Sequence, residues 1–151
     1  MSAPLEASID IAATPDKVWA VVSDLSRMPE WSPQCRRMQL LGQLREGALT
    51  INLNKDGWKV WPTTSTVVRV EQDKAIAFRM NENRTTWSYE LTPSAIGTTV
   101  TERRVESAGG IPKPITFAID KLLGGTPNFE HNLVAGMHQG LKKIKGAVEQ
   151  G

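Results

Sequence analysis

The sequence predicts an α+β fold in which an antiparallel β-sheet packs against one long C-terminal helix. Apolar and polar residues alternate in short segments through the first two thirds of the chain, which is typical of half-buried strands. The pair Asp56–Gly57 is a strong hairpin signal, and strands joined by hairpins are antiparallel. After residue 126 the apolar residues recur at helical spacing instead. A helix that follows such a sheet is expected to pack across it.

The first strand is expected at residues 5–12, where Leu5, Ala7, Ile9 and Ile11 share one face. Thr14–Pro15 follows, an N-cap residue and then proline at the first helical position. Apolar residues at 18–25 then predict a short amphipathic helix, and Ser26 is a candidate cap for a second short turn. Two short helices are therefore expected after the first strand.

The stretch DLSRMPEWSP, residues 24–33, places Trp31 between two prolines. Pro29 and Pro33 fix φ and lack a backbone donor, which excludes the interior of a regular helix or a central strand. A tryptophan ring nevertheless prefers to be covered. Two interpretations of Trp31 stay open: it caps the hydrophobic core, or it contacts a ligand.

Six further strands are expected, at residues 34–41, 48–55, 58–70, 75–81, 84–91 and 98–107. Pro62 indicates a bulge or an edge position near the start of its strand. Alternation assigns one face of each strand, and the sets that share a face are Leu49, Ile51 and Leu53, expected inward; Thr64, Thr66, Val68 and Val70; Ile76, Phe78 and Met80; and Thr85, Trp87, Tyr89 and Leu91.

The last part of the chain is expected to be helical. Glycines and prolines after residue 108 end the sheet, and residues 114–123 are long enough for a short helix. Thr126–Pro127 repeats the cap-then-proline signal and starts the long helix. The residues of this helix that recur at helical spacing are Phe129, Leu133, Met137, Leu141, Ile144 and Val148.

Composition narrows the class of protein. A chain of 151 residues suits one domain, here expected over residues 1–151, and a net charge of +2 is too small to indicate nucleic-acid binding. A single cysteine excludes an internal disulfide and fits a cytoplasmic location. No signal peptide is recognised, and no apolar run is long enough for stable insertion into a membrane.

Few residues offer catalytic chemistry. His131 and His138 are seven apart and have no matching cysteine or carboxylate cluster, so no metal site and no cofactor are expected. Tyr89 is the one tyrosine and is expected inward. Glu102 and Arg103 are neighbours on one strand, so one of them faces the interior and needs a partner or a ligand there. Alternation alone leaves open which of the two it is.

Several motifs together resemble a known family. They are T-P-D-K-V-W, then S-D-L-S-R-M-P-E-W-S-P, the glycine of R-E-G before a strand, the L-T-P…G-T-T-V-T hairpin and the long C-terminal helix. In this order and spacing the chain resembles the polyketide cyclase/dehydrase-like branch of the START/Bet v 1-like (SRPBCC) superfamily, over roughly residues 5–148. The resemblance implies a helix-grip fold, in which a seven-stranded antiparallel sheet wraps the C-terminal helix and encloses a hydrophobic cavity.

The resemblance also implies a ligand, and two functions of different class follow. One is binding of a hydrophobic small molecule, such as a lipid, a polyketide-like aromatic or an isoprenoid. The other is a cyclase or dehydratase that uses the same cavity, with Tyr89 and Arg103 as candidate proton-transfer groups. An interaction protein with a filled pocket is a minor third reading, and a homodimer stays open. The residues expected to line the cavity are Trp31, Leu49, Ile51, Trp61, Phe78, Met80, Trp87, Tyr89, Phe129, Leu133 and Met137.

Overall fold

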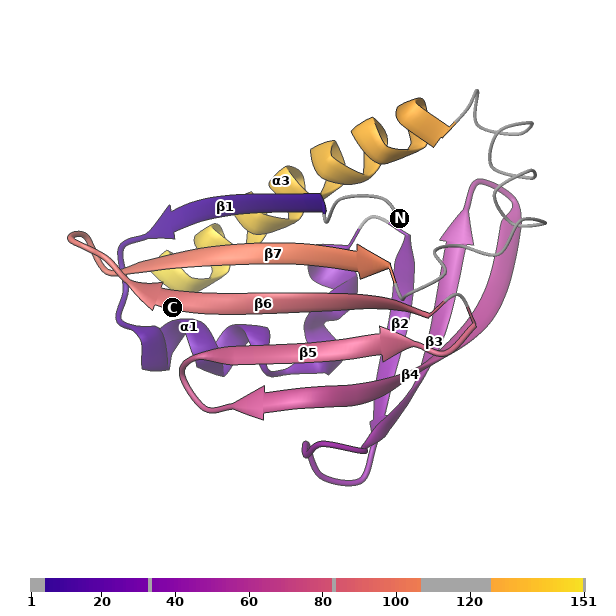
Figure 1. Cartoon of the computed structure of the whole chain (residues 1–151), viewed down its shortest axis with the longest axis horizontal. Helices are drawn as coiled ribbons and strands as arrows, with labels where there is room; N and C mark the ends of the chain where they lie inside the picture. Colours follow the sequence, from indigo (N-terminus) through magenta and orange to yellow (C-terminus); the bar gives the residue numbers. More distant parts are fainter. Residues whose placement is uncertain (1–4, 33, 83, 107–125, 151) are drawn as a thin grey trace.

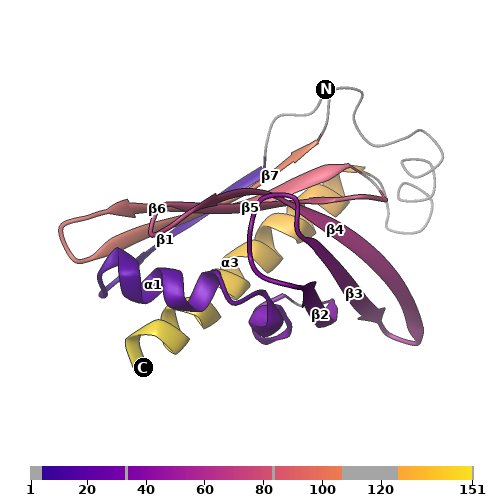
Figure 2. The same cartoon turned by 90° about the horizontal axis from the view of Figure 1, so that it is seen from below.

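One curved antiparallel sheet and a layer of helices make up the described part of the chain (Figures 1 and 2). The computed structural model describes residues 5–32, 34–82, 84–106 and 126–150, with the side chains of the final helix from residue 132 onward. The sheet has seven strands in the order β1-β7-β6-β5-β4-β3-β2, so β1 and β2 form its edges. The helices all cover the same face of the sheet, which is the fold that the sequence predicts.

The elements follow the predicted order closely. The helical segments are α1 (Pro15–Val22), the 3-10 helix η1 (Leu25–Glu30) and α3 (Thr126–Gln150). The strands are β1 (Leu5–Ile11), β2 (Cys35–Leu41), β3 (Leu49–Asp56), β4 (Lys59–Glu71), β5 (Ala75–Met80), β6 (Thr85–Pro93) and β7 (Thr98–Glu106). All seven predicted strands are confirmed, and the predicted helix at 114–123 lies outside the described residues.

Local signals explain most of the boundaries. Helix α1 begins at Pro15, as the cap-then-proline pattern predicts. Gly57 adopts a φ of +64° between β3 and β4, the left-handed conformation that favours glycine in a tight hairpin. The prediction for Ser26 is wrong: Asp24 holds the N-cap position of η1, and the Ser26 hydroxyl donates a hydrogen bond to its carboxylate at 2.5 Å.

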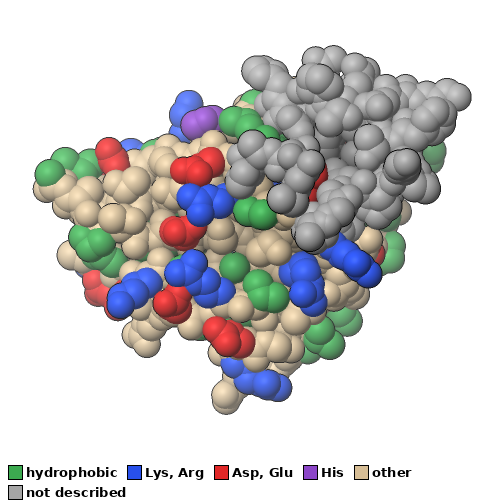
Figure 3. Space-filling model, viewed as in Figure 1, with side chains coloured by type: hydrophobic (Ala, Val, Ile, Leu, Met, Phe, Trp, Pro, Cys, Tyr) green, Lys and Arg blue, Asp and Glu red, His purple; other side chains and the backbone are tan. Residues whose placement is uncertain are grey.

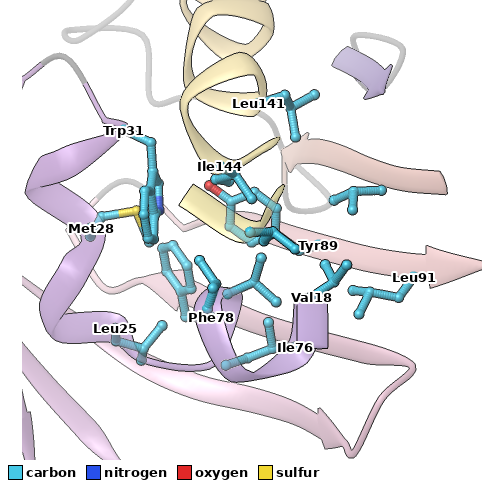
Figure 4. Close-up of a cluster of buried hydrophobic side chains, with 14 of the residues drawn as sticks. Val18, Leu25, Met28, Trp31, Ile76, Phe78, Tyr89, Leu91, Leu141 and Ile144 are labelled. Atoms are coloured by element: carbon cyan, nitrogen blue, oxygen red, sulfur yellow. The ribbon is translucent and has the colours of Figure 1, made fainter. Parts of the chain in front are cut away.

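The hydrophobic core lies between the sheet and the helices (Figure 4). Ile11, Val18, Ile76 and Val100 are fully buried there, and α3 adds the residues that recur at helical spacing, of which Met137, Leu141, Ile144 and Val148 are buried. The buried core residues therefore come from the strands, from α1 and from α3. Burial of such apolar surface stabilises the fold by about 25 cal/mol per Å².

A β-bulge in β4 breaks one predicted pattern. The pairing of β4 with β5 shifts between Val67 and Arg69, so one extra residue enters the strand there. Val67 is fully buried, Val68 is exposed, and Val70 packs against the core again. The expectation that residues 64, 66, 68 and 70 share a face is therefore wrong, because the extra residue exchanges the two faces. Pro62 lies before Ser65, where pairing with β5 starts, so its predicted edge position is confirmed.

Strand β3 shows the opposite orientation to the one expected. Leu49, Ile51 and Leu53 are 48%, 50% and 40% exposed, respectively, on the outer face of the sheet. Thr50 and Asn52 between them are buried. The alternation of apolar and polar residues is real, but here the polar set faces the interior. The inward assignment of the three apolar residues is wrong.

Helix α3 approaches the chain after η1 so closely that only glycine fits at the contact. A Cβ added at Gly140 would lie 2.6 Å from the carbonyl oxygen of Trp31. The Trp31 ring is buried, and its backbone N–H donates to the carbonyl of Met28 at 3.1 Å. Trp31 is thus held by helix–backbone contact above the core, and Pro29 lies inside η1 just before it.

Candidate functional site

A cavity of about 480 Å³ lies between the sheet, η1 and the first described turns of α3. Its walls come from all of these elements, so it forms only when the sheet curves around the helix. A volume of this size falls in the range of small-molecule sites in proteins. The cavity has two chemically different walls.

The apolar wall is built from large side chains of η1, the sheet and α3. Trp31 and Met28 come from the region of η1, Phe78 from β5 and Trp87 from β6, and Met137 adds the surface of α3. Trp31, Met28 and Phe78 belong to one buried cluster (Figure 4). Two tryptophans and two methionines offer broad, polarizable surfaces that suit a flat or flexible apolar ligand.

The polar wall is the inner face of β3 and β4. The Thr50 hydroxyl donates to the Asn52 side chain at 2.8 Å and shares a short hydrogen bond with the Ser65 hydroxyl. The amides of Asn52 and Asn54 both donate to the Thr63 hydroxyl, at 3.3 and 2.9 Å. This ladder explains how β3 places polar side chains inside, because each one is partnered by its neighbours. Asn52, Asn54 and Thr63 line the cavity.

Two titratable groups meet inside the cavity. Tyr89 on β6 and Glu102 on β7 are directly opposite each other in the sheet register, and their side chains are hydrogen bonded. Burial raises the pKa of Glu102 to about 8, although the bond from Tyr89 favours the carboxylate and opposes that rise. Burial and the nearby Glu102 also raise the pKa of Tyr89 well above its usual range. Burial therefore favours the protonated form of the Glu102 carboxyl.

Arg104 brings a positive charge to the β7 end of the cavity. It follows Glu102 by two residues on β7, so both point to the interior, and it is buried. Its guanidinium lies 3.5 Å from the carboxylate of Glu106 and 5.9 Å from the ring centroid of Trp87. A buried guanidinium beside an aromatic ring suits a planar, oxygen-bearing group on a ligand.

The open end of the cavity lies at the β3–β4 hairpin. Asp56 and Gln34 are exposed yet line the cavity, and the Gln34 amide donates to the Asp56 carboxylate at 3.4 Å. Trp61, from the returning strand, lines the same region. The hairpin therefore forms one rim of the entrance.

The described residues show neither a metal-binding cluster nor a membrane-spanning helix. No three histidine, cysteine, aspartate or glutamate side chains there are grouped so as to hold a metal ion. No helix in the described part of the chain is both long and apolar enough to cross a membrane.

Comparison with known families identifies the group to which the chain belongs. A family model described as polyketide cyclase/dehydrase and lipid transport matches residues 2–149. The chain is a member of this family. A search by sequence among curated proteins gave no match.

Solved structures show the same fold at low sequence identity. The di-domain aromatase/cyclase StfQ of the steffimycin biosynthetic pathway is 16% identical, with a TM-score of 0.75 over 97% of this chain. The chain spans only 50% of StfQ. The Zhui aromatase/cyclase from a Streptomyces species is 14% identical, with a TM-score of 0.70, covering 98% of this chain and 94% of that one. A protein from Nitrosomonas europaea is 16% identical, with a TM-score of 0.70 and coverage of 97% and 94%. These structures share the helix-grip architecture with this chain.

Most of the residues expected at the cavity lie there in this family member. The structure places eight of them on its walls: Trp31, Trp61, Phe78, Met80, Trp87, Tyr89, Leu133 and Met137. Their contact with a ligand stays a prediction. The side chain of Phe129 lies outside the described residues.

Three candidates lie elsewhere. Leu49 and Ile51 are exposed on the outer face because β3 presents its polar residues inward. Arg103 also points outward, where its guanidinium forms ion pairs with Glu6 at 3.1 Å and Glu90 at 3.0 Å. The register of β7 thus resolves the open choice in favour of Glu102 facing the interior.

Sequence reasoning missed most of the polar side chains that line the cavity. Asn52, Asn54 and Arg104 were not expected at the site, and Glu102 was only one of two alternatives. The available signal was the alternation T-I-N-L-N on β3, which has an equally regular polar set. A hydrogen-bonding set of Thr and Asn in strict alternation fits a polar cavity wall as well as it fits a solvated face.

Proposed function

We propose that this protein binds a small organic molecule that is largely apolar and carries several oxygen groups. The observation that carries the proposal is a cavity that combines apolar surfaces, from Trp31, Phe78 and Trp87, with the polar side chains of Asn52 and Arg104. Polyketide-like aromatic molecules, isoprenoids and lipids with a polar end all combine an apolar body with oxygen groups. The polar wall favours those with several oxygens over a plain hydrocarbon chain.

Affinity and orientation would come from different side chains of the cavity. Covering the apolar part of a ligand supplies most of the favourable free energy, at about 25 cal/mol per Å² before ordering costs. The amides of β3 and the Arg104 guanidinium then select the orientation, because a misplaced ligand leaves buried polar groups without partners. Family membership and the aromatase/cyclase neighbours support such a ligand.

The test is to fill the cavity and measure binding. Native mass spectrometry of the freshly purified protein should show a reproducible added mass that is absent after denaturation. Gly136 on α3 lines the cavity, so Gly136→Leu should abolish the added mass and the binding of the fluorescent probe anilinonaphthalene sulfonate. Gly146→Leu is the matched control, because a Cβ added at that position of the same helix meets nothing within 4 Å. Equal binding by both variants would contradict the cavity as the site.

A second candidate function is catalysis on the same ligand class, and the Glu102–Tyr89 pair favours it. A carboxyl group with a pKa of about 8 can donate and accept a proton near neutral pH, as general acid–base catalysis requires. In a cyclase or dehydratase, it would protonate a ligand carbonyl or remove a proton beside it, while the cavity holds the reactive chain folded.

A single variant can distinguish the binding function from the catalytic function. Glu102→Gln keeps the size and hydrogen bonding of the side chain but cannot exchange a proton. If the protein is an enzyme, this variant should retain ligand affinity and lose turnover of a poly-β-ketone substrate by roughly 10²-fold or more. If the wild-type protein binds such compounds without converting them, the catalytic function is excluded and only the binding function remains.

A further inference from the structure

The tip of the β3–β4 hairpin carries the most exposed large apolar side chain in the described structure. Trp58 follows Gly57 at the turn and is 86% exposed. The four other tryptophans, Trp19, Trp31, Trp61 and Trp87, are buried or half-buried. Tryptophan is poorly suited to bulk water but favours a membrane–water interface, where its ring and its N–H both find partners.

Apolar side chains continue from the tip along the outer face. Val60 is 56% exposed on β4, and Leu53 is exposed on β3 opposite Pro62. The hairpin extends beyond the strands that follow it, because the pairing of β4 with β5 starts only at Ser65 (Figure 2). The tip is therefore free to contact a flat surface without interference from β5, β6 or β7.

Positive charge is concentrated at the same end of the sheet. Residues 34–37 and 53–61 contain Arg36, Arg37, Lys55 and Lys59 against the single carboxylate Asp56, a net charge of +3. The whole chain carries +2, so the remainder carries −1. All four cations are exposed, and the β2–β3 register places Arg37 beside Leu53. The middle of the outer face, in contrast, carries interspersed acidic and basic side chains (Figure 3).

We infer that the β3–β4 hairpin docks on the surface of an anionic lipid bilayer, with Trp58 at the headgroup level and the four cations against the lipid headgroups. An exposed aromatic ring flanked by lysines is the combination that holds proteins at the interface without spanning it. Each Lys or Arg near an anionic leaflet adds to the attraction.

The charge also decides against a second copy of this chain as the occupant. A two-fold dimer places the same surface on both partners, so the four cations of one copy would face those of the other. Like charges brought together in this way repel, whereas anionic lipid headgroups attract them.

The inner face of the same hairpin forms part of the cavity entrance, so docking determines where this entrance lies. Asn54, Asp56 and Trp61 line the entrance of the cavity, while Trp58 and Val60 are exposed on the hairpin. A docked hairpin holds the cavity entrance next to the bilayer, where an apolar molecule is concentrated. The docking does not depend on what the cavity holds; ligand exchange with the bilayer rests on the proposed function.

The test compares vesicle binding by hairpin variants and matched controls. Vesicles of phosphatidylcholine with about a third phosphatidylserine should co-sediment with the protein at low salt, and pure phosphatidylcholine vesicles should bind it far less. Trp58→Ser should weaken binding by roughly tenfold. Ile96→Ser should leave it unchanged, because Ile96 is a 58% exposed residue in the β6–β7 turn. Lys55→Gln with Lys59→Gln should cost about fivefold per charge, and Lys142→Gln with Lys143→Gln, on an exposed part of α3, should cost much less.

Several outcomes would overturn the inference. It fails if the wild-type protein does not bind anionic vesicles, or if Trp58→Ser binds these vesicles as well as Ile96→Ser does. It also fails if Trp58→Ser instead abolishes a dimer seen by sedimentation while vesicles stay unbound. Binding of anilinonaphthalene sulfonate by Trp58→Ser in solution reports on the cavity separately. If the protein binds vesicles but no ligand is found to bind in the cavity, the proposed function is wrong and the docking inference still holds.

Discussion

Gly140 of α3 lies directly against the backbone of Trp31, so that a Cβ on the helix would come within 2.6 Å of the Trp31 carbonyl oxygen. A backbone oxygen cannot rotate away as a flexible side chain can. The contact fixes the helix, the chain after η1 and the Trp31 ring relative to one another. It therefore sets the position of one cavity wall.

Gly140→Ala should destabilise the protein by about 1–3 kcal/mol through overpacking. Gly146→Ala is the control on the same helix, where an added Cβ meets nothing within 4 Å. That change should stabilise the protein by about 1 kcal/mol, because alanine favours helix more than glycine does. Urea unfolding curves of the two variants should shift in opposite directions. Stabilisation by both would mean that α3 is not seated on Trp31.

The orientation of β3 predicts which apolar residues matter for stability. Ile51→Thr should change the free energy of unfolding by less than about 0.5 kcal/mol, because the side chain is half exposed on the outer face. Ile76→Thr removes a fully buried side chain of the same type and should cost about 2–4 kcal/mol. Thermal or urea unfolding measures both. A large loss in Ile51→Thr would indicate that β3 has the opposite register.

Glu102 predicts a specific dependence of stability on pH. Its pKa is about 8 in the folded protein and lies near 4.5 when unfolded, so the folded state holds a proton that the unfolded chain has lost. Stability is then fully present below about pH 4.5 and falls as pH rises toward 8. The loss is at most about 1.4 kcal/mol for each unit between the two pKa values.

The Glu102→Gln variant supplies the control for that dependence. Since its amide does not titrate, the unfolding free energy should decline less steeply between pH 5 and pH 8 than that of the wild type. Urea unfolding at several pH values gives the comparison. Parallel curves for the two proteins would show that Glu102 is charged in the folded state at neutral pH.

The two neighbouring arginines should behave differently toward a ligand. Arg104→Met removes a buried charge from the cavity wall and should lower affinity for anilinonaphthalene sulfonate by about tenfold. Arg103→Met removes only the outer-face ion pairs with Glu6 and Glu90, and should leave affinity within about twofold. Fluorescence titration measures both. Equal losses would mean that the sulfonate is not held by Arg104.

Local chemistry made the fold predictable from sequence. The Asp56–Gly57 turn, the Thr14–Pro15 helix start and the glycine-flanked strands each have a short-range physical cause. The spacing of Leu133, Met137 and Leu141 likewise identified the inner face of α3. These signals do not depend on what the rest of the chain does, which is why boundaries agree closely.

The candidate site was only partly predictable, because alternation identifies two faces without saying which one is inside. On β5 and β6 the apolar face is inside, and Phe78 and Trp87 were placed correctly. On β3 the rule fails, since Asn52 is kept inside by partners on β4 that the strand's own sequence does not reveal. The bulge after Val67 exchanges the inward and outward faces of β4, and the strand's own sequence does not reveal it either. Non-local pairing decided these cases.

Because β3 turns its polar residues inward, an alternative register of this strand competes with the native one. A slip of one residue would exchange the two faces and bury Leu49, Ile51 and Leu53 in place of Thr50 and Asn52. By hydrophobicity alone that misaligned sheet is the more favourable one. The native alignment depends on the tight turn at Gly57 and on the inner hydrogen-bond ladder, so this region is locally frustrated. The polar cavity wall is thus retained against the ordinary tendency of the chain to collapse.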